Sequence, residues 1–150
     1  MIADMRVMRK SRKEIRSLMK GETLSPAFRE RIMLAVTAVN DCRYCSFVHT
    51  RQALQKGVSS EEIITLGEGS FDCCPEEEVP ALLYAQHWAE THGNPDEAAR
   101  AKILEIYGEE KTRAIEFAIR MITAGNLTGN TFDYFLHKLS FGLWNPGKAG

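Results

Sequence analysis

Residues 26–57 decide the fold of this protein and read PAFRERIMLAVTAVNDCRYCSFVHTRQALQKG. Residues 28–39 are apolar nearly all round a helical projection, which is typical of a helix that is buried on most sides. Residues 40–41, an Asn-Asp pair, interrupt this pattern, and a second helix is predicted from about residue 42 to residue 56, before a glycine. We expect the two helices to fold back on each other as a central antiparallel hairpin.

Glycine, proline and capping residues divide the rest of the chain into further helices, and we find no strand pattern. Ser59 and Glu62 form a capping box, which predicts a short helix ending near Gly67, followed by a loop to Cys74. The remaining helices are predicted over residues 75–92 (starting late or kinked at Pro80), 94–107 and 109–139 (one helix or two, because Gly125 and Gly129 weaken the pattern). The sequence therefore predicts an all-α single domain over residues 1–150, with about seven to eight helices.

Composition limits the classes of partner. The chain has 150 residues, 44% of them hydrophobic, which is enough for one core, and its net charge of −1 gives no global attraction to nucleic acid or to an anionic membrane. No stretch approaches the ~18 consecutive apolar residues of a membrane span, and the N-terminus lacks the apolar run of a secretory signal. We expect a cytoplasmic protein without nucleic-acid or membrane partners, in a compartment where thiols stay reduced.

The two ends of the chain differ from its middle. Residues 1–20 hold seven lysines and arginines against two acidic residues. We interpret this segment as a helix with a solvated basic face, and the alternative is a patch that binds nucleic acid or lipid. The tail over residues 141–150 is predicted to be irregular.

Two cysteines and a histidine share one face of the second predicted helix. Cys42, Cys45 and His49 fall within about 60° of one another at 100° per residue. With Asn40 or Asp41 as the helix cap, Cys42 lies in the first turn, where free N–H groups and the helix dipole favour a thiolate. Cys45 and His49 are spaced i, i+4, within reach for proton exchange. The pattern predicts thiol chemistry.

A carboxylate on the preceding helix lies at the same level of the predicted hairpin. Glu30 is ten residues before Asn40 and His49 is nine after it, which places them about 15 Å and 13.5 Å from the turn. Glu30 shares its helical face with mostly apolar residues, and a buried carboxylate needs a partner. We therefore predict a proton relay from Glu30 through His49 to Cys45, with Cys42 as the second thiol.

These residues resemble a known family. The run Leu24-Ser25-Pro26, then Arg29-Glu30, then residues 42–49 (CRYCSFVH) is similar to the carboxymuconolactone decarboxylase superfamily, in its alkylhydroperoxidase D-like branch. That branch has a glutamate twelve residues before a Cys-x-x-Cys and a histidine four residues after it. The resemblance covers residues 24–66 firmly, as a motif-bearing core. The stretch 125–130 (GNLTGN) also resembles the C-terminal helix of these proteins.

The resemblance implies an all-α fold assembled as homo-oligomers, commonly trimers or hexamers. It implies peroxidase or disulfide-reductase chemistry on a hydroperoxide or disulfide substrate, with no haem, flavin, metal or other cofactor. By this resemblance Cys45 attacks the peroxide, Cys42 resolves the sulfenic acid, and a thiol reductant, such as a lipoyl group on a partner protein, resets the pair. The chain departs from the best-studied branch at Tyr44, where that branch has an additional histidine between the cysteines.

Other interpretations of the same residues remain open. The two cysteines could be small core residues, or Glu30, Cys42, Cys45 and His49 could bind zinc, although a second Cys/His pair is missing. A lyase of the lactone decarboxylase type and a non-enzymatic oligomer that senses redox state or metal are the alternative functions.

Further cysteines, histidines and aromatic residues lie outside this constellation. Cys73 and Cys74 are adjacent, which strains a mutual disulfide, so we interpret them as ordinary loop cysteines, with a redox or metal role as the alternative. The remaining histidines are interpreted as helix-surface or helix-end residues: His87, His92 and His137. A C-terminal aromatic cluster is interpreted as core or subunit-interface packing, with the lining of a substrate pocket as the alternative: Phe132, Tyr134, Phe135 and Trp144.

Overall fold

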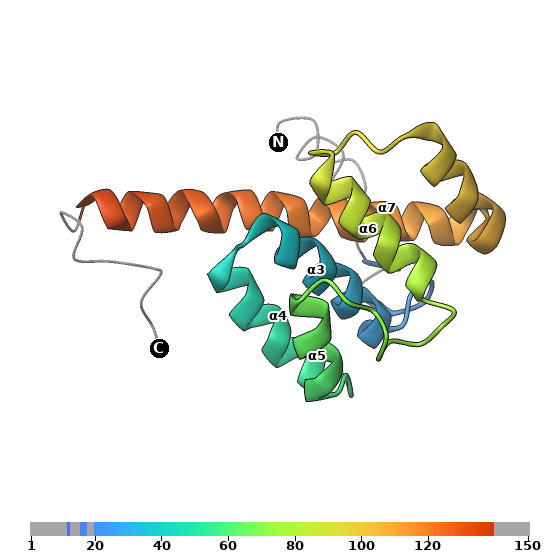
Figure 1. Cartoon of the computed structure of the whole chain (residues 1–150), viewed down its shortest axis with the longest axis horizontal. Coiled ribbons are helices and arrows are strands. Elements are labelled where there is room, and N and C mark those ends of the chain that lie inside the picture. Colours follow the sequence, from blue (N-terminus) through green and yellow to red (C-terminus); the bar gives the residue numbers. More distant parts are fainter. Residues whose placement is uncertain (1–11, 13–15, 18–19, 140–150) are drawn as a thin grey trace.

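In the computed structural model, residues 12, 16–17 and 20–139 are described, and they form helices and loops with no strand among them (Figure 1). The labelled helices are α3 (Pro26–Asn40), α4 (Arg43–Gln55), α5 (Ser60–Gly67), α6 (Val79–Glu90) and α7 (Glu97–Leu139). The all-α prediction is confirmed, whereas these five helices fall short of the predicted seven to eight in the described part of the chain. Most of the basic helix predicted over 1–20, and the tail over 141–150, lie outside the described residues.

Helix α3 is the centre of the fold. Ser25 caps it by accepting a hydrogen bond from the Phe28 backbone N–H (3.1 Å), and Pro26 occupies its first turn. All residues from 28 to 37 are buried, and the helix contacts each of α4, α5, α6 and α7. The prediction of a helix buried on most sides is thus confirmed, and α4 packs against it as the second arm of the hairpin (Figure 1).

A buried arginine on α3 fixes two neighbouring elements. The Arg31 guanidinium donates to Glu62 of α5 (2.9 Å) and to Glu78, the residue before α6 (3.0 Å). These carboxylates offset the cost of burying the guanidinium. Glu62 also closes the predicted capping box with Ser59, so one carboxylate serves both the start of α5 and its attachment to α3.

Of two helix starts, one confirms a predicted alternative and the other, expected at residue 94, needs correction. Helix α6 begins at Val79 rather than at Pro75, which is the late start predicted from Pro80, because a proline lacks an N–H and fits only the first turn of a helix. Helix α7 begins at Glu97, where the preceding Asp96 side chain accepts a hydrogen bond from the Ala99 N–H (2.7 Å). Both starts suit the first N–H groups of a helix, which have no acceptor within the helix. Asp96 supplies an acceptor at the start of α7, and Pro80 in the first turn of α6 has no N–H group to satisfy.

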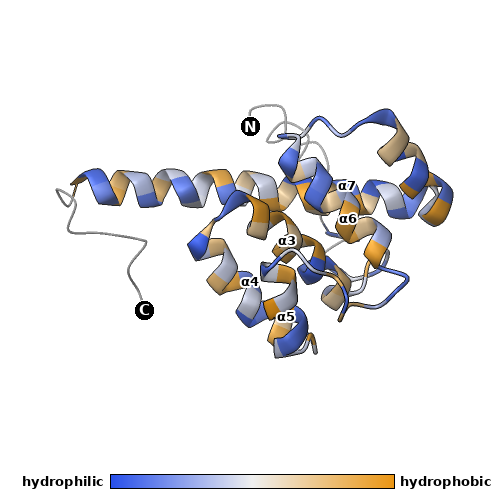
Figure 2. Ribbon diagram, in the orientation of Figure 1, coloured by the Kyte–Doolittle hydropathy of each residue, from blue (hydrophilic) through white to orange (hydrophobic). Residues whose placement is uncertain are grey.

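The long helix α7 contains one break and one projecting end. Gly108 has φ 74° and ψ 171°, so the helical segment from Glu97 ends there as predicted and a second segment continues to Leu139 without a break at Gly125 or Gly129. The C-terminal part of α7 extends beyond the other helices (Figure 1) and carries hydrophobic residues along it (Figure 2).

The predicted aromatic cluster lies on this projecting end. Phe132, Tyr134 and Phe135 are all exposed, so core packing within one chain is wrong for them, whereas Trp144 lies outside the described residues. Across the part of the chain that the structure describes, no helix combines the length and the apolar character needed to cross a membrane.

Candidate redox-active site

The turn between α3 and α4 positions the two cysteines. Asp41 adopts a left-handed conformation (φ 49°) that reverses the chain after Asn40. Cys42 is the N-cap of α4, and its Sγ accepts a hydrogen bond from the backbone N–H of Cys45 (3.3 Å). Our prediction of Asn40 or Asp41 as the cap is therefore wrong by one or two residues. The correction places the Cys42 sulfur directly on the free N–H groups of the helix, which favours a thiolate.

Cys42 and Cys45 form a disulfide at the start of α4. Both side chains are almost completely buried, and a glycine of α7 packs against them. A Cβ atom on Gly129 would lie 2.7 Å from Cys42 Sγ and 3.2 Å from Cys45 Sγ, so no side chain fits at this position without displacing one of the partners. The pair is thus covered by bare backbone of a helix that lies more than eighty residues further along the chain.

Glu30 and His49 meet as their distances from the turn predict. Glu30 is 1% exposed, and its Oε2 lies 2.8 Å from Nδ1 of His49. The other carboxylate oxygen, Oε1, accepts hydrogen bonds from the Arg29 guanidinium (3.1 and 3.3 Å). This guanidinium stabilises the buried carboxylate, which in turn orients the imidazole. Arg29 was not predicted as part of the site, because neighbours in sequence point to different sides of an ideal helix.

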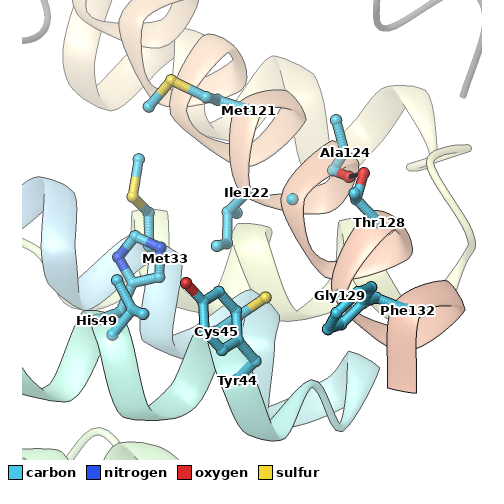
Figure 3. A pocket seen from close by; sticks show the side chains of 12 residues that line it. Met33, Tyr44, Cys45, His49, Met121, Ile122, Ala124, Thr128, Gly129 and Phe132 are labelled. Atoms are coloured by element: carbon cyan, nitrogen blue, oxygen red, sulfur yellow. Dashed lines mark hydrogen bonds between the residues drawn. The ribbon is translucent and has the colours of Figure 1, made fainter. Parts of the chain in front are cut away.

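A cavity of about 750 Å³ opens on the Cys45 side of the pair (Figure 3). Tyr44, Cys45 and His49 line it from α4, and Met33 lines it from α3. Helix α7 supplies the opposite wall, which includes Ile122, Gly125 and Thr128. The cavity is mostly apolar, with an imidazole and a phenol at the face that holds Cys45, so an organic molecule with a polar reacting end suits it. His49 and Cys45 face this common space, as their i, i+4 spacing predicts.

Polar residues of α7 attach that helix to the α3–α4 hairpin. Thr37 donates a hydrogen bond to the Asn126 side-chain oxygen (3.2 Å), and the Asn130 amide donates to the Asn40 carbonyl (2.9 Å). With Gly129 between them, these residues form one face of α7 at i, i+3, i+4 spacing. Residues 125–130 were expected to matter only because they resemble a known family. The sequence also holds a physical signal for this contact, which is the helical spacing of a small residue and two amide side chains.

The remaining cysteines lie elsewhere. Cys73 is exposed and Cys74 half-buried, in the loop before α6, and both are free thiols. Burial raises the pKa of the Cys74 thiol from 9.0 to about 11. Within the described residues, no group of three or more Cys, His, Asp or Glu side chains is arranged to hold a metal ion.

Comparison with known families agrees with the site. The model of the carboxymuconolactone decarboxylase family matches residues 6–91, a span that includes Glu30, both cysteines of the pair and His49. This chain belongs to the carboxymuconolactone decarboxylase family. Members of this family are mostly enzymes of decarboxylase or peroxidase-like type and are helical proteins, as the structure is here. Neither the curated proteins nor the solved structures with which the chain was compared gave a match.

Proposed function

We propose that this family member is a thiol-dependent oxidoreductase of the alkylhydroperoxidase D-like branch, which reduces hydroperoxides or disulfides through Cys42 and Cys45. One observation carries the proposal. A cysteine pair close enough to be disulfide-bonded shares a cavity with His49, whose imidazole is held by the buried carboxylate of Glu30. Thiolate, proton carrier and orienting carboxylate are the groups that peroxide reduction requires, and no cofactor is needed for them to act.

The proposed reaction assigns one sulfur to each step. The Cys45 thiolate attacks the peroxide oxygen, an S–O bond forms as the O–O bond breaks, and the departing alkoxide takes a proton from His49. Cys42 then attacks the Cys45 sulfur and releases water, which leaves the Cys42–Cys45 disulfide. A thiol reductant, for example a dithiol such as a lipoyl group on a partner protein, returns the pair to two thiols and is itself oxidised.

The geometry supports these roles by burial and by position. The Cys42 sulfur accepts the helix N–H of Cys45, so its thiolate is stabilised as a nucleophile towards an oxidised Cys45. Glu30 is shielded from water and fixed between His49 and the Arg29 guanidinium. A carboxylate held in this way keeps the imidazole in one orientation, and the other ring nitrogen remains available to the cavity.

The experiment is a thiol titration combined with intact-mass analysis, after addition of a slight excess of cumene hydroperoxide to the reduced protein. The wild type should lose two thiols and two mass units, while Cys42→Ser should retain an oxygen adduct on Cys45. Cys73→Ser serves as the control and should behave as the wild type, because this exposed thiol lies outside the site. If Cys42 and Cys45 both stay reduced under these conditions, the proposal is wrong.

The family match itself supports a second candidate. Because the family is named for a lactone decarboxylase, a lyase that uses Glu30 and His49 without the thiols is the alternative. Turnover of a carboxylated lactone by the Cys42→Ser/Cys45→Ser protein would establish the lyase. Loss of peroxide consumption in the same variant, without lactone turnover, would support the oxidoreductase.

We also propose that the protein forms a homo-oligomer, a trimer or a hexamer, through the projecting end of α7. Exposed aromatic and aliphatic side chains gather there, and contiguous apolar patches on a surface often mark interfaces between proteins. Phe132 both lines the cavity at the cysteine pair and belongs to this exposed surface. A neighbouring subunit packed on α7 would therefore also close the cavity.

A further inference from the structure

Each cysteine of the pair lines a different cavity. Cys45 lines the cavity of about 750 Å³ described above. Cys42 instead lines a second cavity of about 510 Å³, and the two cavities have no lining residue in common. Because both cysteines are almost completely buried, a reactant reaches each sulfur through the cavity that its residue lines.

The second cavity lies among α3, α4 and α5. Helix α3 contributes Thr37, helix α4 contributes Ser46 and Thr50, and helix α5 contributes Ile63 and Gly67. The start of α4 adds a carboxylate and a guanidinium, which give this space a more polar and charged lining than the apolar cavity at Cys45 has: Asp41 and Arg43. A polar molecule therefore fits here better than in the cavity at Cys45.

Helix α7 borders only one of the two cavities. A Cβ on Gly129 would lie 2.7 Å from Cys42 Sγ and 3.2 Å from Cys45 Sγ, and Gly129 lines the cavity at Cys45 but not the one at Cys42. The Asn130 amide, one residue further on, is bonded to the Asn40 carbonyl at the turn. A reactant in the first cavity therefore meets Cys45, with the backbone of α7 beside it.

Disulfide exchange requires the attacking thiolate to approach a sulfur in line with the bond that breaks. Attack on Cys42 must therefore come from the side opposite Cys45, and of the two cavities Cys42 lines the second and not the first. Access to the attacked sulfur is one of the factors that set the rate of exchange. His49 lies on the Cys45 side, where it can protonate that sulfur as it leaves.

We propose that the thiol reductant binds in the second cavity and attacks Cys42, whereas the oxidising substrate meets Cys45 in the first. The reductant thiolate forms a new S–S bond with Cys42 as the Cys42–Cys45 bond breaks, and Cys45 leaves with a proton from His49. A second thiol of the reductant then attacks the reductant's own sulfur, which releases Cys42 and leaves the reductant as a disulfide. This inference rests on the proposed redox function of the pair.

The first test identifies the attacked sulfur directly. The oxidised protein is mixed with glutathione, quenched with acid at early times, alkylated and digested with trypsin. Cleavage after Arg43 separates Cys42 (peptide 32–43) from Cys45 (peptide 44–51), so a glutathione adduct can be assigned by mass. We expect the earliest adduct on Cys42 and an alkylated Cys45. An adduct that first forms on Cys45 overturns the inference.

The second test narrows each cavity separately. Ser46→Leu fills the cavity at Cys42 and should slow reduction by glutathione about 10-fold, with oxidation by cumene hydroperoxide little changed. Thr128→Leu is the matched variant in the cavity at Cys45 and should slow the oxidation instead. Gln52→Leu, an exposed position of α4 that lines neither cavity, should leave both rates at the wild-type values. If Ser46→Leu slows both half-reactions equally or neither, the separate reductant site is wrong.

The outcomes distinguish this inference from the proposed function. If the cysteine pair can be neither oxidised by hydroperoxide nor reduced by thiols, the function itself fails and no adduct forms on either peptide. If the pair cycles normally but the adduct lies on Cys45, the function stands and only the assignment of two cavities is wrong.

Discussion

At the scale of single residues, Glu30 is a buried carboxylate of α3 that contacts His49, a residue of the proposed site on α4. It is buried, it accepts from Arg29 and it holds His49, so its charge affects both folding and the proposed proton transfer. A glutamine at the same position keeps the shape and an acceptor oxygen but removes the negative charge of the group that contacts the imidazole.

We expect Glu30→Gln to slow oxidation of the reduced pair by cumene hydroperoxide about 100-fold, within the range of general acid–base effects. Stopped-flow kinetics of oxidation measure this rate. Glu116→Gln is the matched control, because this carboxylate is bonded to Arg100 and Tyr84, away from the cysteine pair. Full oxidation activity in a folded Glu30→Gln protein would remove Glu30 from the relay.

Gly129 is needed for its lack of a side chain rather than for backbone freedom. Gly129→Ala places a Cβ 2.7 Å from Cys42 Sγ, so we expect the oxidised protein to lose about 1–3 kcal/mol of unfolding free energy through overpacking. Gly125→Ala, on the same helix, has its nearest contact at 4.0 Å, so it should stabilise α7 by about 0.5–1 kcal/mol. Chemical denaturation of both variants gives the comparison, and equal effects of the two substitutions would contradict the role of Gly129.

The Cys74 thiol is expected to be slow to react near neutral pH. Its pKa is raised from 9.0 to about 11, so at pH 8 it holds about 100-fold less thiolate than an unperturbed thiol does. Alkylation of Cys74 by iodoacetamide, followed by mass spectrometry in the Cys73→Ser protein with the pair oxidised, should therefore accelerate about tenfold per pH unit up to pH 10. A rate that levels off near pH 9 would contradict the raised pKa.

At the scale of elements, the fold depends on the contacts that α3 makes with the other helices. Its apolar face packs on four helices, and its Arg31 adds specific attachments to α5 and to the residue before α6. Both carboxylate partners are close to buried in the structure, which distinguishes this network from ion pairs at the surface.

We expect Arg31→Leu to lower the unfolding free energy by about 3 kcal/mol, because it leaves Glu62 and Glu78 buried without their cation. Arg100→Leu is the matched control and should cost less than ~1 kcal/mol, since the Arg100 side chain is 44% exposed, against 9% for Arg31. Urea denaturation measures both values. Similar losses in the two variants would show that burial does not decide the strength of these pairs.

At the scale of the whole molecule, the projecting end of α7 carries large apolar side chains that are exposed in the described part of the chain. Its exposed apolar residues include Phe135 (58% exposed) and Leu139 (61% exposed), which share one helical face. Burial of side chains of this size contributes about 1.5–3 kcal/mol each, so self-association through this face is favoured.

We therefore expect Phe135→Asp to convert the oligomer to a monomer in analytical ultracentrifugation. The matched control is Ile64→Asp on α5, which is similarly exposed (61%) but lies away from α7, and it should leave the assembly unchanged. Neither residue lines the cavity at Cys45, so a change in oxidation rate on dissociation would report closure of that cavity by a neighbouring subunit. A wild type that sediments as a monomer would refute the proposed oligomer.

Much of the candidate site was determined by the sequence alone. The all-round apolar pattern predicted a buried α3, and the short turn after Asn40 predicted that α4 would return along it. Equal distances from that turn brought Glu30 and His49 together, and helical spacing placed Cys45 and His49 on one face. These are local relations, because helical periodicity and a short connection fix the positions of residues within one hairpin.

Only the tertiary structure decided which distant residues complete the site. Gly129 against the sulfurs and the contact between Asn130 and Asn40, ninety positions apart, follow from how α7 packs across the hairpin. The partners of Arg31 and the division of the pair between two cavities have the same origin. A helical pattern indicates which face of a helix is buried but not which other helix covers it, since many neighbours satisfy the same apolar face. That choice is made by packing of the whole chain.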